Sequence, residues 1–254
     1  MSFLSDQLLG FIRRHLSIQR RVKLGIALRH RRQAYQLLDG NGLEIGALHN
    51  PAAIPARCSI TYADAITTQE ASANFPELNA NELVPVSIIV DLDKTGLTTV
   101  QDESFDFAIL NHVIEHVANP IAVVSELFRV VRKGGLVVIS APDKYFTYDK
   151  PRSLTPFSHL RDEYVANVTA VGDDHYRELV LATLKPHLAK NETLVQEKMA
   201  EYRLRREHAH VWDSLSFRSF MLQALDFLDI QAELEWESFG AQNRLEYFSV
   251  WKKR

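Results

Sequence analysis

The sequence predicts an α/β protein built on a doubly wound parallel sheet. Short and almost wholly apolar strands alternate with helical segments from residue 43 onward, a glycine turn ends the first strand, and acids follow two later strands. Such uniformly apolar strands are typical of a parallel sheet covered by helices on both faces. Right-handed crossovers then bring the carboxyl ends of the strands to one edge of the sheet.

Five strands are expected in the first part of the chain. They are assigned to residues 43–45, 60–64, 86–91, 105–110 and 136–140. Pro51 is placed to open a helix after the first strand. Asn119 and Pro120 predict the N-cap and the first residue of a longer helix, and Lys133-Gly134-Gly135 predicts its C-terminal cap.

The alternation breaks at Pro142. Residues 141–211 are rich in Tyr, His, Asp, Arg and Pro, with helical patches around 158–166 and 174–206. A helix over 216–228 and strands near 230–236 and 244–251 resume the α/β pattern. An insertion directly after a strand lies on the ligand side of such a sheet. We therefore expect residues 141–211 to recognise a substrate, with Tyr145, Arg152 and His159 as candidate substrate-binding residues.

We divide the chain into an N-terminal basic helical segment, residues 1–39, and one α/β domain, residues 40–254. Residues 3–32 have apolar side chains at helical spacing and a polar face rich in arginine. Two interpretations stay open. The favoured one is a lid helix packed on the main domain, and the other is peripheral contact with an anionic membrane or with a partner protein.

Composition limits the class of protein. No run of 18 apolar residues is present, so no membrane-spanning helix is expected, and the N-terminus does not have the pattern of a secretory signal. Cys58 is the single cysteine, which excludes an internal disulfide and suits a reducing compartment. We expect a cytoplasmic protein. Because residues 1–32 contribute +7 to a net charge of −3, the rest of the chain carries −10, which does not favour a nucleic-acid partner.

The predicted strand ends place four features at one sheet edge: Gly46, Asp64, Asp91 and the pair Asn111-His112. Gly46 allows a ligand to approach the backbone closely. An acid at the position of Asp64 can accept both hydrogens of a ribose diol, as in dinucleotide sites. Asp91 is placed to accept from an adenine amino group. Together these features predict a crevice for a nucleotide-like cofactor.

These motifs resemble the class I S-adenosylmethionine-dependent methyltransferases. The matching stretches are Leu43-Glu44-Ile45-Gly46, Tyr62-Ala63-Asp64, Val90-Asp91-Leu92, and the block from Ser104 through Val117 that continues over Leu127 to Gly135. The resemblance covers residues 40–141 and implies a Rossmann-like seven-stranded sheet with a helical insertion after strand five. It also implies S-adenosylmethionine as the cofactor.

The resemblance implies a role for each matching residue. Glu44, Gly46 and Ala47 would line the methionine and ribose region, and Asp64 would hold the ribose. Asp91 and Leu92 would flank the adenine, while Asn111 and His112 would lie beside the methionine end. The family's usual first motif has two or three close glycines, whereas Ala47-Leu48-His49 follows Gly46 here, so Leu48 or His49 would narrow the cofactor pocket.

A dehydrogenase with the same fold is not favoured, because the Gly-x-Gly-x-x-Gly fingerprint is absent from the first turn. The Glu-Ile-Gly-Ala-Leu-His-Asn-Pro form of the turn also resembles a bacterial methyltransferase-11-like subgroup found beside polysaccharide and glycan biosynthesis. This likeness favours a small-molecule or saccharide acceptor, methylated on a hydroxyl.

Methyl transfer to a hydroxyl needs alignment and a base. We take His116 and His210 as the candidate catalytic bases. His112, Glu115 and His116, with His208 or His210, also have donor types that bind a divalent cation, but a structural role is favoured and no metal is assigned. Two further functions stay open: a non-catalytic cofactor-binding scaffold of the same fold, and a metal-assisted RNA methyltransferase.

Overall fold

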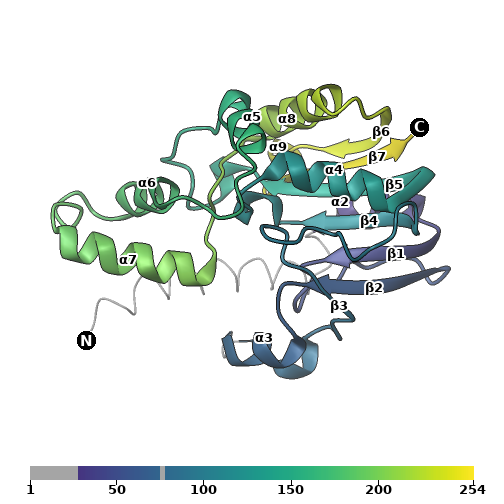
Figure 1. The fold of residues 1–254 in the computed structure, drawn as a ribbon, viewed down its shortest axis with the longest axis horizontal. Helices are drawn as coiled ribbons and strands as arrows, with labels where there is room; N and C mark the ends of the chain where they lie inside the picture. The colour runs from purple at the N-terminus through teal and green to yellow at the C-terminus, as the bar shows by residue number, and fades with distance from the viewer. Residues whose placement is uncertain (1–27, 75–77) are drawn as a thin grey trace.

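The computed structural model describes residues 28–74 and 78–254. They form one seven-stranded mixed sheet with helices on both faces, in the order β3-β2-β1-β4-β5-β7-β6 (Figure 1). The strands are β1 (Gly40–Ile45), β2 (Cys58–Asp64), β3 (Ile88–Ile89), β4 (Phe105–Asn111), β5 (Val131–Pro142), β6 (Ala232–Ser238) and β7 (Glu246–Lys253). The predicted doubly wound α/β fold is confirmed.

The helices lie between and beyond these strands. They are α2 (Arg29–Ala34), α3 (Thr68–Asn74), α4 (Pro120–Val130), α5 (Phe157–Val165), α6 (Asp173–Thr183), α7 (Glu192–Arg205), α8 (Ser214–Phe227) and α9 (Gly240–Asn243), with short 3-10 turns η1 (Tyr35–Leu37), η2 (Ala80–Glu82), η3 (Ile114–His116) and η4 (Lys144–Phe146). None of the helices in the described ranges is long and apolar enough to cross a membrane. The predicted amphipathic face from Leu4 to Val22 lies outside the described residues.

The sheet separates two apolar layers, as a doubly wound sheet requires. On one face, side chains of β1, β4 and β5 pack with the apolar stripes of α4 and α8. On the other face, Phe107, Ile109 and Val138 pack against Tyr35 and Leu38 at the end of the N-terminal helical turns. Because both faces are covered, the central strands are buried almost throughout, which explains their uniformly apolar sequence.

The start of α4 is as predicted, but its end is not. The Asn119 side chain accepts the Ala122 N–H at 3.1 Å, and Pro120 is the first helical residue. The helix ends at Val130, and residues 131–135 already belong to β5. The glycine pair therefore does not cap the helix. A Cβ atom on Gly135 would lie 2.5 Å from the Asp106 carbonyl oxygen, so this glycine allows β4 and β5 to approach closely.

Three other predicted elements differ in the structure: one helix is absent, one strand is shorter, and one helical patch is divided. The helix expected at Pro51 is absent, because Pro55 would fall in its interior and remove a hydrogen bond. The strand predicted over 86–91 is reduced to Ile88–Ile89 at the edge of the sheet. The helical patch over 174–206 is two helices, α6 and α7, which are separated by a segment that contains Pro186.

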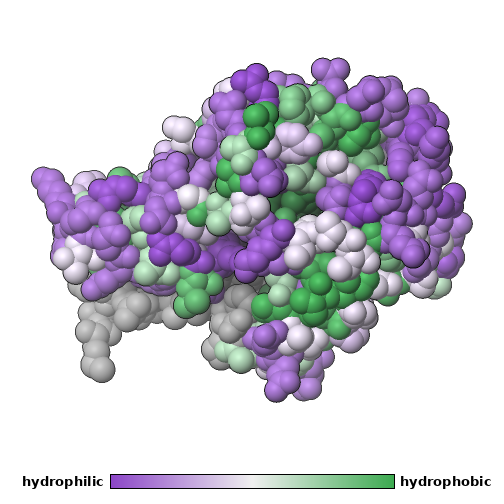
Figure 2. Space-filling model, in the orientation of Figure 1, coloured by the Kyte–Doolittle hydropathy of each residue, from purple (hydrophilic) through white to green (hydrophobic). Residues whose placement is uncertain are grey.

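The insertion after β5 lies beyond the carboxyl ends of the parallel strands. Figure 1 shows α6 and α7 packed together and extending away from the sheet at the left of the view, while α5 lies beside α4. Hydrophilic residues cover much of α6 and α7 (Figure 2). The segment between α7 and α8 returns to the sheet, where the N–H groups of Ala209 and His210 donate to the Glu115 carbonyl at 2.8 and 3.1 Å.

Candidate active site

The four predicted strand ends meet at one edge of the sheet. Strands β3, β2, β1 and β4 are parallel neighbours, with Ile45 paired to both Ala63 and Leu110, and Asp64 paired to Ile89. The residues that follow these pairs therefore lie along one continuous edge, which is where open α/β sheets bind their ligands.

The first turn holds a buried carboxylate. Glu44 is 3% exposed, and its two carboxylate oxygens accept the Ala52 N–H at 2.9 and 3.1 Å. Burial raises the pKa of Glu44 to about 7, against the opposing effects of the Ala52 hydrogen bond and the Arg31 charge. The Glu44 side chain thus fixes the loop that follows β1, and it stands close to its own protonation point at neutral pH.

The backbone turns sharply after β1. Gly46 has φ +72°, and a Cβ atom there would lie 2.5 Å from the Val113 side chain. Leu48 also takes a left-handed conformation, with φ +49°, and its carbonyl accepts the Val84 N–H at 2.9 Å. Ala47 is buried between them. The missing Cβ atom of Gly46 therefore allows the turn to pack closely against Val113.

Asp64 ends β2, at the position where the ribose is expected. Its carboxylate accepts the backbone N–H groups of Ala65 and Ile66, and burial raises its pKa above the ordinary value. Each carboxylate oxygen has more than one acceptor site, so Asp64 retains capacity to accept two hydroxyl hydrogens. This partly satisfied acid fits the ribose diol of an adenosyl group.

Asp91, at the predicted adenine position, is paired with a side chain of the insertion. Arg206 approaches it with an N–O distance of 2.7 Å, and Lys94 lies 3.4 Å away. Burial opposes ionisation of Asp91, but the hydrogen bond and charge of Arg206 lower its pKa below the ordinary value. Leu92 packs against the main core beside it. The insertion therefore reaches into the crevice at this end.

Asn111 and His112 are both held by partners from distant parts of the chain. Asn111 donates to the Tyr35 hydroxyl at 3.0 Å and accepts from Ser140 at 3.0 Å. His112 has φ +55°, and its Nε2 atom lies 2.8 Å from the Glu246 carboxylate. These bonds fix the edge of β4 where the methionine end is expected.

Glu246 is a site residue that the sequence did not reveal. It is fully buried and contacts Arg31, with Nε–O and Nη2–O distances of 2.7 and 2.5 Å, and His30 at 2.6 Å. Although burial opposes ionisation, the charge of Arg31 holds the pKa of Glu246 well below its ordinary range. Glu246 begins the antiparallel strand β7, so its position at the carboxyl edge of β4 and β5 follows from the topology.

A second acid–histidine group lies just beyond β4. His116 Nε2 lies 3.6 Å from Glu115 Oε1, and His208 Nε2 lies 3.8 Å from the same oxygen. Glu115 is 1% exposed, and neither of its carboxylate oxygens makes a hydrogen bond. His116 Nδ1 donates to the Arg206 carbonyl at 2.5 Å, and His208 Nδ1 donates to Asp149 at 2.6 Å. Both imidazoles thus direct Nε2 toward one buried carboxylate.

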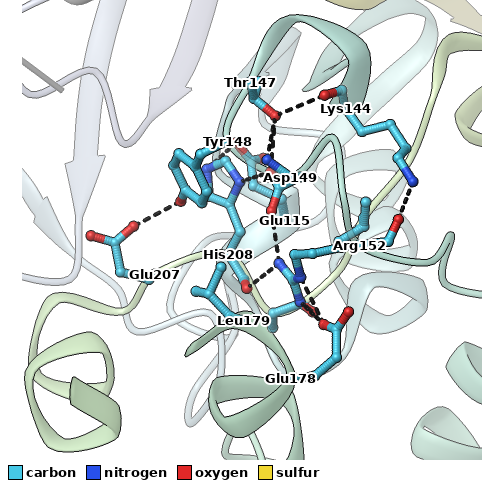
Figure 3. A network of polar contacts seen from close by, with 12 residues as sticks. Glu115, Lys144, Thr147, Tyr148, Asp149, Arg152, Glu178, Leu179, Glu207 and His208 are labelled. Atoms are coloured by element: carbon cyan, nitrogen blue, oxygen red, sulfur yellow. Dashed lines mark hydrogen bonds and ion pairs between the residues drawn. The ribbon is translucent and has the colours of Figure 1, made fainter. Parts of the chain in front are cut away.

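Asp149 and Arg152 support this group from within the insertion (Figure 3). Arg152 is 2% exposed and donates to Asp149, to the His208 carbonyl and to Glu178, at 2.8, 2.9 and 2.7 Å. Desolvation lowers the pKa of His208, but the Asp149 charge and hydrogen bond raise it overall to about 8. The buried Arg152 side chain also donates to the Ala209 carbonyl, so it holds the segment that carries His208.

The other predicted site residues are divided between a surface and a buried cluster. Tyr145 is exposed and lies beside the Lys144 ammonium group. His159 and His210 belong to a cluster with His175, in which His210 is buried and burial lowers its pKa well below the ordinary value. The structure thus places His116 beside Glu115 and the Arg206 carbonyl, and places His210 in a separate cluster with His159 and His175.

Fold and site together define a class I methyltransferase. The strand order with an antiparallel β7 is that of the class, and Asp64, Glu44 and the Gly46 turn lie at the carboxyl edge of the parallel strands, where the cofactor is expected. A family model described as "Methyltransferase domain" matches residues 17–231. The chain belongs to this family and is an S-adenosylmethionine-dependent methyltransferase.

Solved structures are similar in fold but distant in sequence. A Rhodobacter sphaeroides protein, provisionally named a Zn-dependent alcohol dehydrogenase, has a TM-score of 0.51 and 15% identity over 87% of this chain and 88% of its own. A Pyrococcus horikoshii protein has a TM-score of 0.50 and 13% identity over 93% and 91%. A Thermotoga maritima protein described as a SAM-dependent methyltransferase has a TM-score of 0.49 and 16% identity over 100% of both chains. No curated protein matches the sequence.

Proposed function

We propose that this chain methylates a hydroxyl group of a small-molecule or saccharide acceptor. The observation that carries the proposal is the His116–Glu115 pair at the end of β4, with an Nε2–Oε1 distance of 3.6 Å. The surroundings of His116 lower its pKa by desolvation, so the imidazole is neutral at pH 7. A neutral histidine beside the expected methionine end is suited to take a proton from an acceptor hydroxyl.

The residues around His116 support this role. Its Nδ1–H is fixed by the Arg206 carbonyl, so the proton acceptor is Nε2, and 30% of the side chain is exposed. The Glu115 carboxylate would stabilise the imidazolium that forms. His208, held by Asp149, would in turn keep Glu115 ionised. S-adenosylmethionine supplies the methyl group when it is bound, and alignment of the acceptor is the main task left to the protein.

Acceptor recognition is assigned to the insertion, residues 141–211. Tyr145 is exposed on η4, whereas His159 lies in the cluster with His175 and His210 and is not assigned to the acceptor. An exposed aromatic face such as that of Tyr145 suits a saccharide, whose ring has both apolar faces and hydroxyl groups. Arg152 is proposed to position His208 rather than to bind the acceptor, because it is buried and fully engaged with protein groups.

The cofactor part of the proposal is tested by calorimetric titration with S-adenosylhomocysteine. Asp64→Ala should weaken binding by about 1–3 kcal/mol, the usual value for a hydrogen bond to a charged group. Asp39→Ala is the matched control, because Asp39 is an exposed acid that precedes β1 and so lies away from the carboxyl ends of the strands. This variant should leave the affinity for S-adenosylhomocysteine unchanged. Equal affinities for both variants and the wild-type protein would show that the ribose lies elsewhere.

The catalytic part is tested by methyl transfer to a panel of saccharide and small-molecule hydroxyl acceptors. His116→Gln should lower kcat by about 10²–10⁴-fold, the usual contribution of a general base, with S-adenosylhomocysteine affinity retained. Loss of the acidic limb of the pH–rate profile in the variant would separate a base from a structural residue. Cofactor binding without transfer to any acceptor would favour the non-catalytic scaffold instead.

Metal-assisted transfer to an RNA end is a second candidate, and the Glu115–His116–His208 group favours it. One carboxylate and two imidazoles, each with its Nδ1–H bound to a fixed acceptor, make up a donor set typical of a divalent-cation site. A cation there would hold two neighbouring oxygens of a terminal ribose. This candidate predicts that a chelator abolishes turnover, and that Glu115→Gln loses both metal and activity. Activity that persists in chelator would contradict it.

A further inference from the structure

Three histidines and a glutamate converge in the insertion, away from the crevice. The Nε2 atoms of His159 and His175 are 3.3 Å apart, and each lies 3.2 Å from Glu163 Oε1. His210 Nε2 lies 3.7 Å from Glu163 Oε2. One donor atom from each of the three histidines lies within 4.8 Å of the others. The three imidazoles therefore converge, and the Glu163 carboxylate lies beside all of them.

The polar contacts around these residues leave part of the cluster without a hydrogen-bond partner. His175 Nδ1 donates to the Ala209 carbonyl at 3.2 Å, so the Nε2 atom of a neutral His175 has a lone pair that faces the Glu163 carboxylate and His159. Glu163 Oε2 and His210 Nε2 are buried and make no hydrogen bond. Buried polar atoms without a partner, such as Glu163 Oε2 and His210 Nε2, are costly, and a bound cation would remove this cost.

We propose that His159, Glu163, His175 and His210 form a binding site for a divalent transition-metal ion. The donor set is three imidazole nitrogens and one carboxylate oxygen, which suits Zn²⁺. With Zn–ligand distances of about 2.0–2.1 Å, the ligands of a tetrahedral site are about 3.3 Å apart. The separations among His159 Nε2, His175 Nε2 and Glu163 Oε1, at 3.2, 3.2 and 3.3 Å, match this value. His210 Nε2 lies 3.7 Å from the other carboxylate oxygen, Glu163 Oε2, so a rotation of the Glu163 side chain would complete the set.

The backbone supplies these ligands from three separate segments. His159 and Glu163 are four residues apart on α5, so they lie on the same helix face. His175 is in the first turn of α6, and His210 precedes α8. A metal ion at this point would join α5, α6 and the segment that returns to the sheet. Because four protein ligands leave no open position, the site is a structural one that holds the insertion together.

This site is distinct from the Glu115–His116–His208 group. The two groups share no residue, and the side chains of His208 and His210 reach different clusters from the same segment. The proposal also does not depend on methyl transfer, since it predicts metal binding by the protein whatever its acceptor. Its test can therefore be read without an activity assay.

The test is calorimetric titration of the full-length, chelator-treated chain with ZnCl2. The wild-type protein should bind Zn²⁺ at this site, and His159→Ala and Glu163→Gln should each weaken that binding by at least about 100-fold, more than the loss of an outer-shell partner causes. His187→Ala is the matched control, because His187 is an exposed histidine of the same insertion, and it should bind as the wild-type protein does.

A second measurement separates this site from the other cluster and from misfolding. Saturating Zn²⁺ should raise the Tm of the wild-type protein and of His208→Ala by about 5 °C or more, but not that of His159→Ala. His159 is partly exposed, so His159→Ala should keep the wild-type circular dichroism spectrum. If His208→Ala abolishes binding while His159→Ala does not, the metal belongs to the other cluster and the proposal is wrong. Absence of Zn²⁺ binding by the wild-type protein would also overturn it.

Discussion

Glu44 provides a direct test of the electrostatics at the first turn. Its carboxylate is buried at 3% exposure, and burial raises its pKa from 4.5 in the unfolded chain to about 7. The folded state therefore binds a proton more tightly than the unfolded state between these two pH values. A difference of about 2.5 pKa units corresponds to about 3 kcal/mol of stability that the wild-type protein loses as the pH rises from below 4.5 to above 7.

Glu44→Gln removes this ionisation and retains an oxygen that accepts the Ala52 N–H. We expect the free energy of unfolding of the variant, relative to wild type, to increase by about 3 kcal/mol between pH 4.5 and pH 8. Urea denaturation at several pH values measures the difference. Glu235→Gln is the control, because Glu235 is an exposed glutamate of β6, and its difference from wild type should not change with pH.

The sign of the Glu44 effect is what the measurement decides. A wild-type protein that gains stability relative to Glu44→Gln as the pH rises would mean that the folded-state pKa of Glu44 is lowered, not raised. The carboxylate would then have a cationic partner in the folded protein, and the picture of an acid held mainly by one backbone N–H would be wrong.

Three further predictions concern the crevice and its supports. Asp149→Asn should cost about 2 kcal/mol of stability at pH 7, because His208 and Arg152 overcome the effect of burial and lower the pKa of Asp149 to about 2. Urea denaturation near pH 3 should show about half of this loss. Gly46→Ala should destabilise the protein more than Gly134→Ala in the same assay. Both glycines have positive φ, so each variant loses about 1–2 kcal/mol for the left-handed backbone, but of the two only a Cβ on Gly46 would meet another atom within 4 Å. Equal losses of stability would contradict the contact with Val113. Arg206→Ala should change stability by less than about 1 kcal/mol, since its ion pair with Asp91 is partly exposed. The same variant frees Asp91 for the adenine, so its affinity for S-adenosylhomocysteine should increase in calorimetry. Unchanged affinity would argue that Asp91 does not bind the adenine.

The sequence correctly predicted the features that depend on interactions between neighbouring residues. Asn119 and Pro120 start α4 as expected, because a cap and a preset φ act within one helical turn. The predicted end of the same helix was wrong, because Gly135 serves a contact with Asp106 of the neighbouring strand. A glycine required by tertiary packing and a glycine required by a helix cap look the same in the sequence.

The candidate site was predictable only in part, for a related reason. Strand order follows from the α/β alternation, so the sequence alone was enough to place Asp64 and Asp91 at one edge of the sheet. Glu246 could not be placed in this way, because its role depends on the antiparallel return of β7 and on Arg31 from the opposite end of the chain. Glu163 was likewise passed over, since its neighbours His175 and His210 come from segments whose packing no local pattern encodes.

The segment from Arg206 to His210 connects these parts of the molecule. Arg206 reaches Asp91, where the adenine is expected, His208 reaches Glu115 and Asp149, and His210 reaches the cluster around Glu163. Its backbone is fixed at the Glu115 carbonyl by the N–H groups of residues 209 and 210. Because these contacts lie on alternate residues of one short stretch, a shift of the segment moves all three at once. A metal ion at His210 would therefore restrain the position of His208 and of Arg206, and so the geometry of the crevice to which both belong.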